Sequence, residues 1–222
     1  MEKCYSALRI GVLASGRGSN FQSIIDAIGD KTLRAEIAVL ITDNPAAFAI
    51  ERAEKHGIEY LVIKPGDYGS KEDFYIKIAS ELKDRRVGLV VLGGFMRIVG
   101  KPLIDAFPGR IMNIHPALLP AFRGLHGQKQ ALEYGVKISG CTVHFVDEGM
   151  DTGPIIIQAA VPVYHDDTEE ILSERILKLE HKIYPEAIRL FSEGRIEVEG
   201  RIVRVKGNAI PDQSIVNPPL RA

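Results

Sequence analysis

The sequence of 222 residues is short of cysteine, of net charge and of long apolar runs, and each shortage excludes a class of protein. The two cysteines, Cys4 and Cys141, fit neither a disulfide framework nor a Cys-x-x-Cys metal site, so we expect a reducing, cytoplasmic compartment. A formal net charge of −1 predicts no nucleic-acid or membrane partner. No apolar run approaches the roughly 20 residues that span a bilayer. We also expect no signal peptide, because a strand-like segment follows the N-terminus almost directly.

What is present is typical of a globular α/β protein. Hydrophobic residues make up 45% of the chain and charged residues 26%, and the length fits one α/β domain more readily than two small ones. No internal repeat or linker divides the chain. We therefore predict a single domain over residues 1–207, followed by a tail at 208–222 that has three prolines, little periodicity and, we expect, little order.

Strand-like and helical segments alternate through the first half, which requires a parallel sheet with right-handed crossovers. The expected strands are 8–14, 36–41, 60–63, 87–92 and 111–115. The expected helices are 21–28, 46–56, 71–85, 102–106, 128–134 and a long one capped by Thr168, which Pro185 should kink or restart. Hairpins are expected at 138–163 and 195–206. The predicted fold class is therefore α/β, a three-layer, mostly parallel twisted sheet with antiparallel strands added in the C-terminal half.

The most informative stretch is Ile111–Pro120, a short apolar run that breaks at Pro116. Asn113 and His115 stand two residues apart just before the break, and such residues share one face of a strand. The prolines favour an ordered loop after the strand. An amide donor beside an imidazole at the end of a strand suits acyl-group chemistry, although a structural histidine is the usual alternative.

A glycine-rich turn, Gly16-Arg17-Gly18-Ser19-Asn20, joins the first strand to the first helix. A Walker A loop is excluded because Arg17 and Gly18 occupy its lysine and hydroxyl positions. A dinucleotide fingerprint is excluded because Phe21 replaces its third glycine. Backbone N–H groups at a helix N-terminus, with Ser19 and Asn20 as further donors, nevertheless predict an anion site rather than a turn that binds nothing.

Several other titratable residues have competing interpretations. Asp43 matches the place of a ribose-binding acid, but Asn44-Pro45 beside it favours a helix cap or turn, and we prefer the cap. Asp151 lies in a turn that can return to the sheet edge near His115, where a carboxylate can raise an imidazole's pKa. His144, on the preceding strand, is as compatible with supporting the site or with the core as with a catalytic role. We expect three further histidines on the surface: His56, His165 and His181. No metal-ligand spacing and no Gly-x-Ser-x-Gly elbow is present.

Five motifs occur in the order found in the phosphoribosylglycinamide formyltransferases. They are the glycine turn 16–20, Phe95-Met96-Arg97-Ile98, the Asn-x-His-Pro-x-Leu-Leu-Pro motif at 113–120, Gly124-Leu125-His126 and the turn 147–154. The long motif is shared by the wider folate-dependent formyltransferase family. The glycine turn, Gly-Leu-His and residues 179–185 narrow the resemblance from that wider family to the phosphoribosylglycinamide formyltransferases. The resemblance extends from about residue 9 to 196.

The resemblance implies a Rossmann-like formyltransferase fold and transfer of a formyl group from 10-formyltetrahydrofolate to the amine of glycinamide ribonucleotide, a step of purine biosynthesis. It implies a ribonucleotide-binding N-terminal half, a folate-binding C-terminal half, no metal and a monomer or weak homodimer. The implied catalytic residues are Asn113, His115 and Asp151, with His144 in support. The implied ribonucleotide-binding residues are Gly16, Arg17, Gly18, Ser19, Asn20, Lys71, Pro116 and Glu180. The implied folate-binding residues are Met96, Arg97, Ile98, Val99, Asn113, Asp147, Glu148, Gly149, Met150 and Asp151.

Formyl transfer to an amine needs no protein nucleophile, because the amine attacks the formyl carbon directly. We hypothesise that Asn113 and protonated His115 donate to the oxyanion while Asp151 supports His115 and relays the amine's proton. Three rival functions remain: a formyltetrahydrofolate hydrolase, a methionyl-tRNA formyltransferase, and a nucleotide-binding module or dehydrogenase. The first two would need more chain, and the missing third glycine counts against the last.

Overall fold

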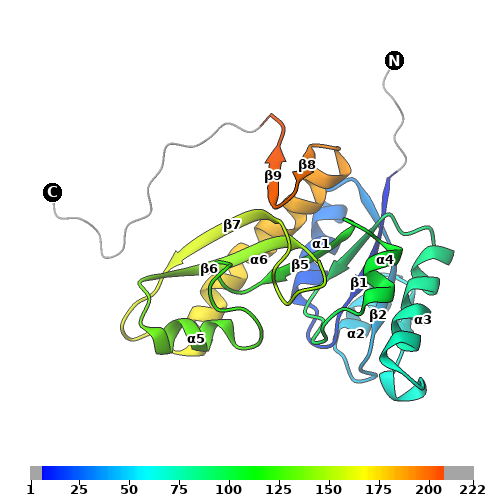
Figure 1. The fold of residues 1–222 in the computed structure, drawn as a ribbon, viewed down its shortest axis with the longest axis horizontal. Helices are drawn as coiled ribbons and strands as arrows, with labels where there is room; N and C mark the ends of the chain where they lie inside the picture. Colours follow the sequence, from blue (N-terminus) through cyan, green and yellow to red (C-terminus); the bar gives the residue numbers. More distant parts are fainter. Residues whose placement is uncertain (1–6, 208–222) are drawn as a thin grey trace. The chain divides into compact units, whose positions relative to one another are not determined.

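The computed structural model describes residues 7–207, so the predicted tail at 208–222 and Cys4 lie outside the described residues. Figure 1 shows the fold as a ribbon coloured along the sequence. Seven strands form one hydrogen-bonded sheet in the order β3-β2-β1-β4-β5-β6-β7. The ladders β1–β2, β1–β4, β2–β3 and β4–β5 are parallel, whereas β6–β7 is antiparallel. The predicted class, a mostly parallel α/β sheet with antiparallel strands in the C-terminal half, is confirmed.

The chain divides into two compact units. Unit 1 ends at Asn113 and also contains Phe145–Glu148, and unit 2 contains Ile114–His144 and the chain from Gly149 onward. The division therefore falls inside two strands, β5 (Ile111–His115) and β6 (Ile138–Phe145). Each unit is described separately below.

Unit 1 contains the parallel strands and the helices that connect them. Its strands are β1 (Leu8–Leu13), β2 (Ala35–Thr42), β3 (Tyr60–Val62) and β4 (Leu89–Leu92), with β5 as far as Asn113. Its helices are α1 (Ser19–Gly29), α2 (Ala49–Lys55), α3 (Lys71–Asp84) and α4 (Lys101–Ala106), with the short 3-10 turn η1 (Pro65–Asp67).

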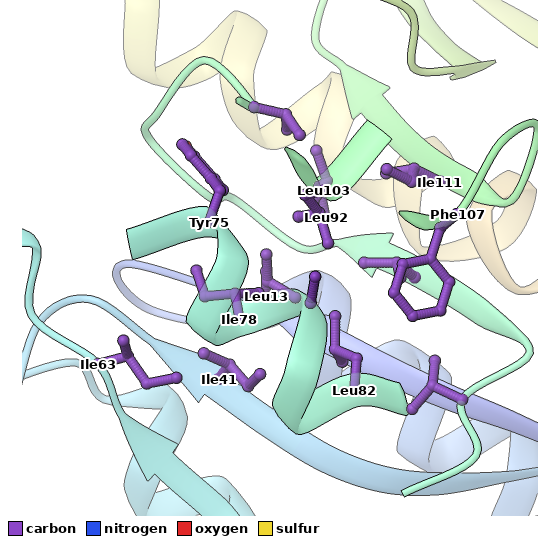
Figure 2. Close-up of a cluster of buried hydrophobic side chains, with 14 of the residues drawn as sticks. Leu13, Ile41, Ile63, Tyr75, Ile78, Leu82, Leu92, Leu103, Phe107 and Ile111 are labelled. Atoms are coloured by element: carbon purple, nitrogen blue, oxygen red, sulfur yellow. The ribbon is translucent and has the colours of Figure 1, made fainter. Parts of the chain in front are cut away.

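The side chains of β1 alternate between the two faces of the sheet, so this strand contacts helices in the layers on both sides. A Cβ atom on Gly11 would lie 2.3 Å from Leu82 of α3, so this face of β1 admits α3 only because residue 11 has no side chain. Leu13 packs into the same apolar core with Ile78 and Leu82 (Figure 2). Phe21 and Ile24 of α1 are fully buried as predicted.

Unit 2 contains the β6–β7 hairpin, with β7 at Ile155–Pro162, and the helices α5 (Gly127–Tyr134) and α6 (Glu169–Ser192). A second, two-stranded sheet pairs β8 (Ile196–Glu199) with β9 (Ile202–Val205), as predicted. The core of this unit joins Leu172 and Ile176 of α6 to Cys141 and Val161 of the hairpin. Thr168 caps α6 by accepting a hydrogen bond from the backbone N–H of Ile171, also as predicted.

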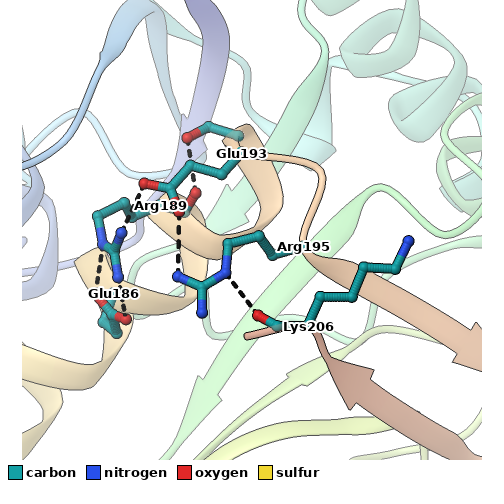
Figure 3. Close-up of polar contacts among 6 residues, drawn as sticks. Glu186, Arg189, Glu193, Arg195 and Lys206 are labelled. Carbon is teal, nitrogen blue, oxygen red and sulfur yellow. Dashed lines mark hydrogen bonds and ion pairs between the residues drawn. The ribbon is translucent and has the colours of Figure 1, made fainter. Parts of the chain in front are cut away.

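Ion pairs tie the end of α6 to the hairpin that follows it (Figure 3). Arg189 bridges Glu186 and Glu193, and Arg195 contacts Glu193 and donates to the backbone carbonyl of Lys206. The carboxylates stand three and four residues from Arg189, the spacing at which helical side chains meet. The network fixes how β9 returns to the helix end.

Two local predictions are wrong. Helix α2 begins at Ala49 rather than residue 46, because Asn44 directs a polar turn over the residues before it. Of the kink or restart expected at Pro185, the restart is wrong, because helix α6 runs unbroken from Glu169 to Ser192 with Tyr184, Pro185 and Ile188 buried, and the kink stays a prediction. Burial of that apolar face compensates the hydrogen bond that the proline removes.

Candidate active site

The glycine turn of unit 1 leads from β1 into the N-terminus of α1. Gly18 adopts φ +64°, and a Cβ there would lie 2.8 Å from Cβ of Ala49, so both the backbone and the packing require glycine. No side chain caps α1 and no acidic residue occupies its first turn. The anion site expected at this helix N-terminus stays a prediction, and an uncapped first turn without acidic residues is consistent with it.

Helix α2 holds the back of this turn. The N–H of Ala49 donates to the carbonyl of Gly16, and Nε of Arg52 donates to the carbonyl of Arg17 at 2.9 Å. The side chain of Arg17 is exposed, whereas Asn20 is buried. Arg52 was not predicted as a site residue, because the residues around it in the sequence give no sign of its contact with Arg17, 35 residues away.

The predicted folate segment 96–99 follows β4 in unit 1. The side chains of Met96 and Ile98 are exposed although apolar, and Val99 is buried. A cavity of about 220 Å³ lies beside this segment. It is lined by Lys71, Glu72, Ile98, Val99, Gly100, Lys101, Pro102, Ile104 and Glu148. Lys71 therefore shares a cavity with three residues of the predicted folate set, Ile98, Val99 and Glu148.

The Asp43 side chain has a different role from the predicted helix cap. It forms an ion pair with Nε of Arg97, and its own side chain is 8% exposed. The turn is made instead by Asn44, whose Oδ1 accepts from the N–H of Ala46. The cap interpretation of Asp43 is wrong because α2 starts six residues later, beyond the reach of its carboxylate.

The predicted catalytic imidazole and carboxylate meet in unit 2. Nδ1 of His115 lies 3.4 Å from Oδ2 of Asp151, and Nε2 of His144 lies 3.7 Å from Oδ1 of the same carboxylate. Oδ2 of Asp151 also accepts a hydrogen bond of 2.8 Å from the N–H of Gly124. The support predicted for His144 thus has a geometric basis, and its side chain is 2% exposed.

Local backbone geometry directs Asp151 into this cluster. Asp151 itself adopts φ +52°, which is uncommon for a residue with a side chain. A Cβ on Gly149 would lie 2.0 Å from Oγ1 of Thr152, so the turn can close only with glycine at that position. Strain of this kind persists where the surroundings fix the conformation, and it is common at functional sites.

Burial and charge decide which protonation states these groups adopt. Burial lowers the pKa of His115 below its usual value, and it outweighs the opposing effects of Asp151 and the Phe122 carbonyl. Burial would raise the pKa of Asp151, but interactions with His144, Gly124 and His115 together hold it below its usual value. The favoured state at neutral pH is thus neutral His115 beside an ionised Asp151. The hypothesis that protonated His115 donates to the oxyanion during the reaction stays a prediction.

The ring of His115 has a defined tautomer. Its Nε2 lies 2.8 Å from the backbone carbonyl of Phe122, and because a carbonyl only accepts, Nε2 carries the hydrogen. In the neutral ring the lone pair is therefore on Nδ1, the nitrogen that faces Asp151. A proton added to Nδ1 would lie directly against the carboxylate.

The loop after His115 is held by a buried hydroxyl that sequence inspection missed. Oγ1 of Thr142 donates to the carbonyl of Ala117 at 2.7 Å and accepts from the N–H of Leu119 at 3.1 Å. Nε2 of Gln158 donates to the carbonyl of Leu119 and to the same hydroxyl. The sequence could have indicated this network only through Thr142 and Gln158, which lie on the two strands of one predicted hairpin.

The remaining predicted site residues fall in both units. Asn113 is half-buried on β5, two residues from His115 on the same face of the strand. Pro116 is half-buried, and Glu180 of α6 is 6% exposed. In the predicted folate turn, Asp147 is half-buried and Glu148 pairs with Lys101 at 2.9 Å, while Gly149 and Met150 are exposed.

The other titratable residues lie outside the cluster of His115, His144 and Asp151. His56 and His165 are exposed as predicted, but His181 is half-buried, so its placement on the surface is wrong. Burial raises the pKa of the Cys141 thiol to about 12, which makes it a poor nucleophile. Within residues 7–207, no group of three or more acidic, histidine or cysteine side chains could hold a metal ion. In the same residues no helix is long and apolar enough to cross a membrane.

Comparisons with known proteins place the chain in a family. A family model described as formyl transferase matches residues 8–188. The phosphoribosylglycinamide formyltransferase of Bacillus subtilis is 46% identical over 82% of this chain and 93% of its own length. The crystal structure of glycinamide ribonucleotide transformylase 1 from Symbiobacterium toebii has 53% identity and a TM-score of 0.89, covering 90% of this chain and 94% of that one.

The chain belongs to the formyl transferase family. Within that family it belongs with the phosphoribosylglycinamide formyltransferases, since it matches the Bacillus subtilis protein over nearly all of that protein's length. It also matches the trifunctional purine biosynthetic protein adenosine-3 of Drosophila melanogaster, with 48% identity over 84% of this chain but only 14% of that protein. A formyltetrahydrofolate deformylase from Pseudomonas syringae is 27% identical with a TM-score of 0.83, and 66% of its chain is covered.

Proposed function

We propose that this chain transfers the formyl group of 10-formyltetrahydrofolate to the amine of glycinamide ribonucleotide, in purine biosynthesis. The observation that carries the proposal is the buried contact between His115 and Asp151, in a chain that a formyl transferase family model matches over residues 8–188. The neighbouring Asn113 supplies an amide on the same face of β5.

The ribonucleotide is bound through its phosphate by residues 16–20. The uncapped N-terminus of α1 and the left-handed Gly18 support this assignment, because both leave backbone N–H groups for an anion. Arg17 is exposed at the turn and adds positive charge there. Glu180 binds the sugar hydroxyls, and Pro116 borders the glycinamide arm.

The folate is bound by residues 96–99 and the 147–151 turn, together with Lys71. The resemblance implies a phosphate contact for Lys71, but its place in the cavity with Ile98, Val99 and Glu148 favours the folate instead. Its ammonium group suits the glutamate carboxylates of a folate. The exposed apolar side chains of Met96 and Ile98 suit the aromatic part of that molecule.

The reaction requires one new carbon–nitrogen bond, one broken carbon–nitrogen bond and one proton transfer. The amine of the ribonucleotide attacks the formyl carbon, and the carbonyl oxygen becomes an oxyanion that accepts from the Asn113 amide. The attacking nitrogen loses a proton, and the folate nitrogen that leaves gains one. Neutral His115 and ionised Asp151 together can hold that proton between these two events, on Nδ1 beside the carboxylate.

Three further expectations remain proposals. Residues 1–207 act as one functional domain, with the ribonucleotide held mainly by the N-terminal half and the folate mainly by the C-terminal half. The protein works in the cytoplasm as a monomer or weak homodimer. Its substrates are the two small molecules, and it needs neither nucleic acid nor metal.

A formyltetrahydrofolate hydrolase is the second candidate, because a deformylase shares the fold. The lower identity to that protein favours the transferase. The test is to supply 10-formyltetrahydrofolate and follow formyl loss with glycinamide ribonucleotide, initiator tRNA or water as the acceptor. Turnover that requires the ribonucleotide supports the proposal, and equal turnover with water alone would replace it with the hydrolase.

A further inference from the structure

Ser15, which no motif includes, stands between the glycine turn and the segment 95–99. It is the residue immediately before Gly16, and its side chain reaches across 81 residues to the loop after β4. Its Oγ accepts a hydrogen bond of 3.0 Å from the N–H of Met96. Its own N–H donates to the carbonyl of Gly94 at 3.1 Å. All of these residues belong to unit 1.

The carbonyl of Ser15 is occupied as well. It accepts from Nδ2 of Asn44 at 3.1 Å, and Asn44 belongs to the turn after β2. Ser15 therefore uses its N–H, its carbonyl and its hydroxyl to join three strand ends. A residue with so many directed contacts has little freedom to move independently of the loop at Gly94–Met96.

The segment 95–99 has two more anchors in unit 1. Arg97 pairs with the buried Asp43, and the hydroxyl of Tyr75 donates to the carbonyl of Ile98 at 2.8 Å. Neither of these contacts involves the glycine turn. The bonds of Ser15 thus link the turn directly to this segment.

We infer that Ser15 couples the two substrate sites, so that phosphate on the glycine turn tightens folate binding at residues 96–99. This inference rests on the proposed function, which assigns those two sites. Phosphate held by the N–H groups after Gly16 restricts the backbone of the turn, and hence Ser15. Met96 is then ordered before the folate binds. Folate binding therefore loses less conformational entropy in ordering its own site.

The test uses inorganic phosphate rather than the ribonucleotide, because phosphate fills the turn without touching the folate. Tetrahydrofolate is the second probe, and its dissociation constant is measured with and without saturating phosphate. Coupling between sites is commonly 5- to 150-fold, and we expect phosphate to tighten folate binding about tenfold. By thermodynamic reciprocity, tetrahydrofolate should tighten phosphate binding by the same factor.

Ser15→Ala removes the hydroxyl and should bring this factor to about one, while Ser15→Thr should restore it. Ser23→Ala is the matched control, because the hydroxyl of Ser23 bonds only within α1, to the carbonyl of Asn20. The control should keep the wild-type factor. A general loss of stability would weaken both affinities without abolishing the dependence of one on the other.

Hydrogen exchange at the Met96 amide gives a second readout that does not involve folate. The side chain of Met96 is 67% exposed, so the protection of its amide depends on the bond to Ser15. Phosphate should slow exchange at Met96 in the wild type and in Ser23→Ala, but not in Ser15→Ala.

Each result decides one claim. If phosphate and tetrahydrofolate both bind but neither alters the other's affinity, the coupling is wrong and the proposed function stands. If Ser15→Ala keeps the full factor, Ser15 is not the link. If the wild type does not bind tetrahydrofolate, the proposed function fails and the coupling with it.

Discussion

Nδ1 of His115 lies 3.4 Å from Oδ2 of Asp151, and the two side chains are only 5% and 12% exposed. The contact joins a strand residue to a turn 36 residues later. Because Nε2 of the ring is already committed to the Phe122 carbonyl, Nδ1 is the nitrogen that can take up a further proton. The pair is consequently a site for one proton, and its properties lead to several of the predictions below.

Replacing Asp151 with asparagine should lower the pKa of His115 further. The carboxylate is the strongest influence that raises this pKa, and the amide keeps the size of the side chain while removing its charge. NMR titration of the His115 ring measures the shift, and turnover should fall by about 100-fold or more if the pair holds the proton. Asp166→Asn, at an exposed site beside His165, is the matched control. An unchanged His115 titration in Asp151→Asn would refute the electrostatic link.

Activity should require the neutral form of His115 and should therefore fall on the acidic side of neutrality. Since the pKa of His115 is lowered in the folded protein, the acid limb of kcat/KM should lie below the pKa of about 6.5 of an ordinary histidine. The pH dependence of kcat/KM for the ribonucleotide measures it. A rate that rises as the pH falls from 7 to 5 would instead favour a protonated histidine as the active form.

The free energy of unfolding should also depend on the protonation of His115. The unfolded chain protonates this histidine at its ordinary pKa while the folded chain keeps it neutral to lower pH, so the unfolded state binds more protons in that window. The free energy of unfolding should hence decrease as the pH falls from 6.5 toward 5. Urea unfolding of His115→Gln should show a shallower decrease, whereas His165→Gln, which alters an exposed histidine, should match the wild type.

Gly18→Ala should damage both stability and anion binding. Gly57 offers a matched control, because it has the same φ of +64° but no atom within 4 Å of a Cβ. Gly57→Ala should cost roughly 1–2 kcal/mol from the backbone alone. Gly18→Ala adds a contact of 2.8 Å with Ala49, so its melting temperature should fall further. Phosphate should raise the melting temperature of Gly57→Ala but not of Gly18→Ala, and equal shifts would argue against the glycine turn as the anion site.

Thr142→Val should loosen the loop that follows His115. The substitution keeps the shape but deprives the Ala117 carbonyl and the Leu119 N–H of their partner, and a buried unsatisfied group costs about 1–3 kcal/mol. Urea unfolding measures the loss, and kcat should decrease with it. Thr32→Val removes a hydroxyl from an exposed turn and should cost less. Equal losses in the two variants would show that the Thr142 network has no special role.

The sequence was sufficient for features that depend on local patterns. The alternation of apolar residues placed the strands and the faces of α1 and α3, and the spacing of Asn113 and His115 predicted their shared face. The residues themselves suggested acyl-group chemistry and a turn that returns Asp151 toward His115, whereas the assignment of these three residues as the catalytic set came from the family resemblance. Contacts across long stretches of chain were not predictable, including Asp43 with Arg97 and Ser15 with Met96. Nor was the balance that lowers the pKa of His115, because burial and the nearby carboxylate act in opposite directions.

The central claim is most directly tested by a single-turnover reaction with 10-formyltetrahydrofolate labelled in its formyl carbon and with glycinamide ribonucleotide as the acceptor. In the wild type, the label should pass to the ribonucleotide in equal amount to the folate released. In Asn113→Ala and His115→Gln, the rate should fall by about 100-fold or more, as when an oxyanion donor or proton carrier is lost. Near-normal transfer in both variants, or label released as free formate by the wild type, would contradict the account.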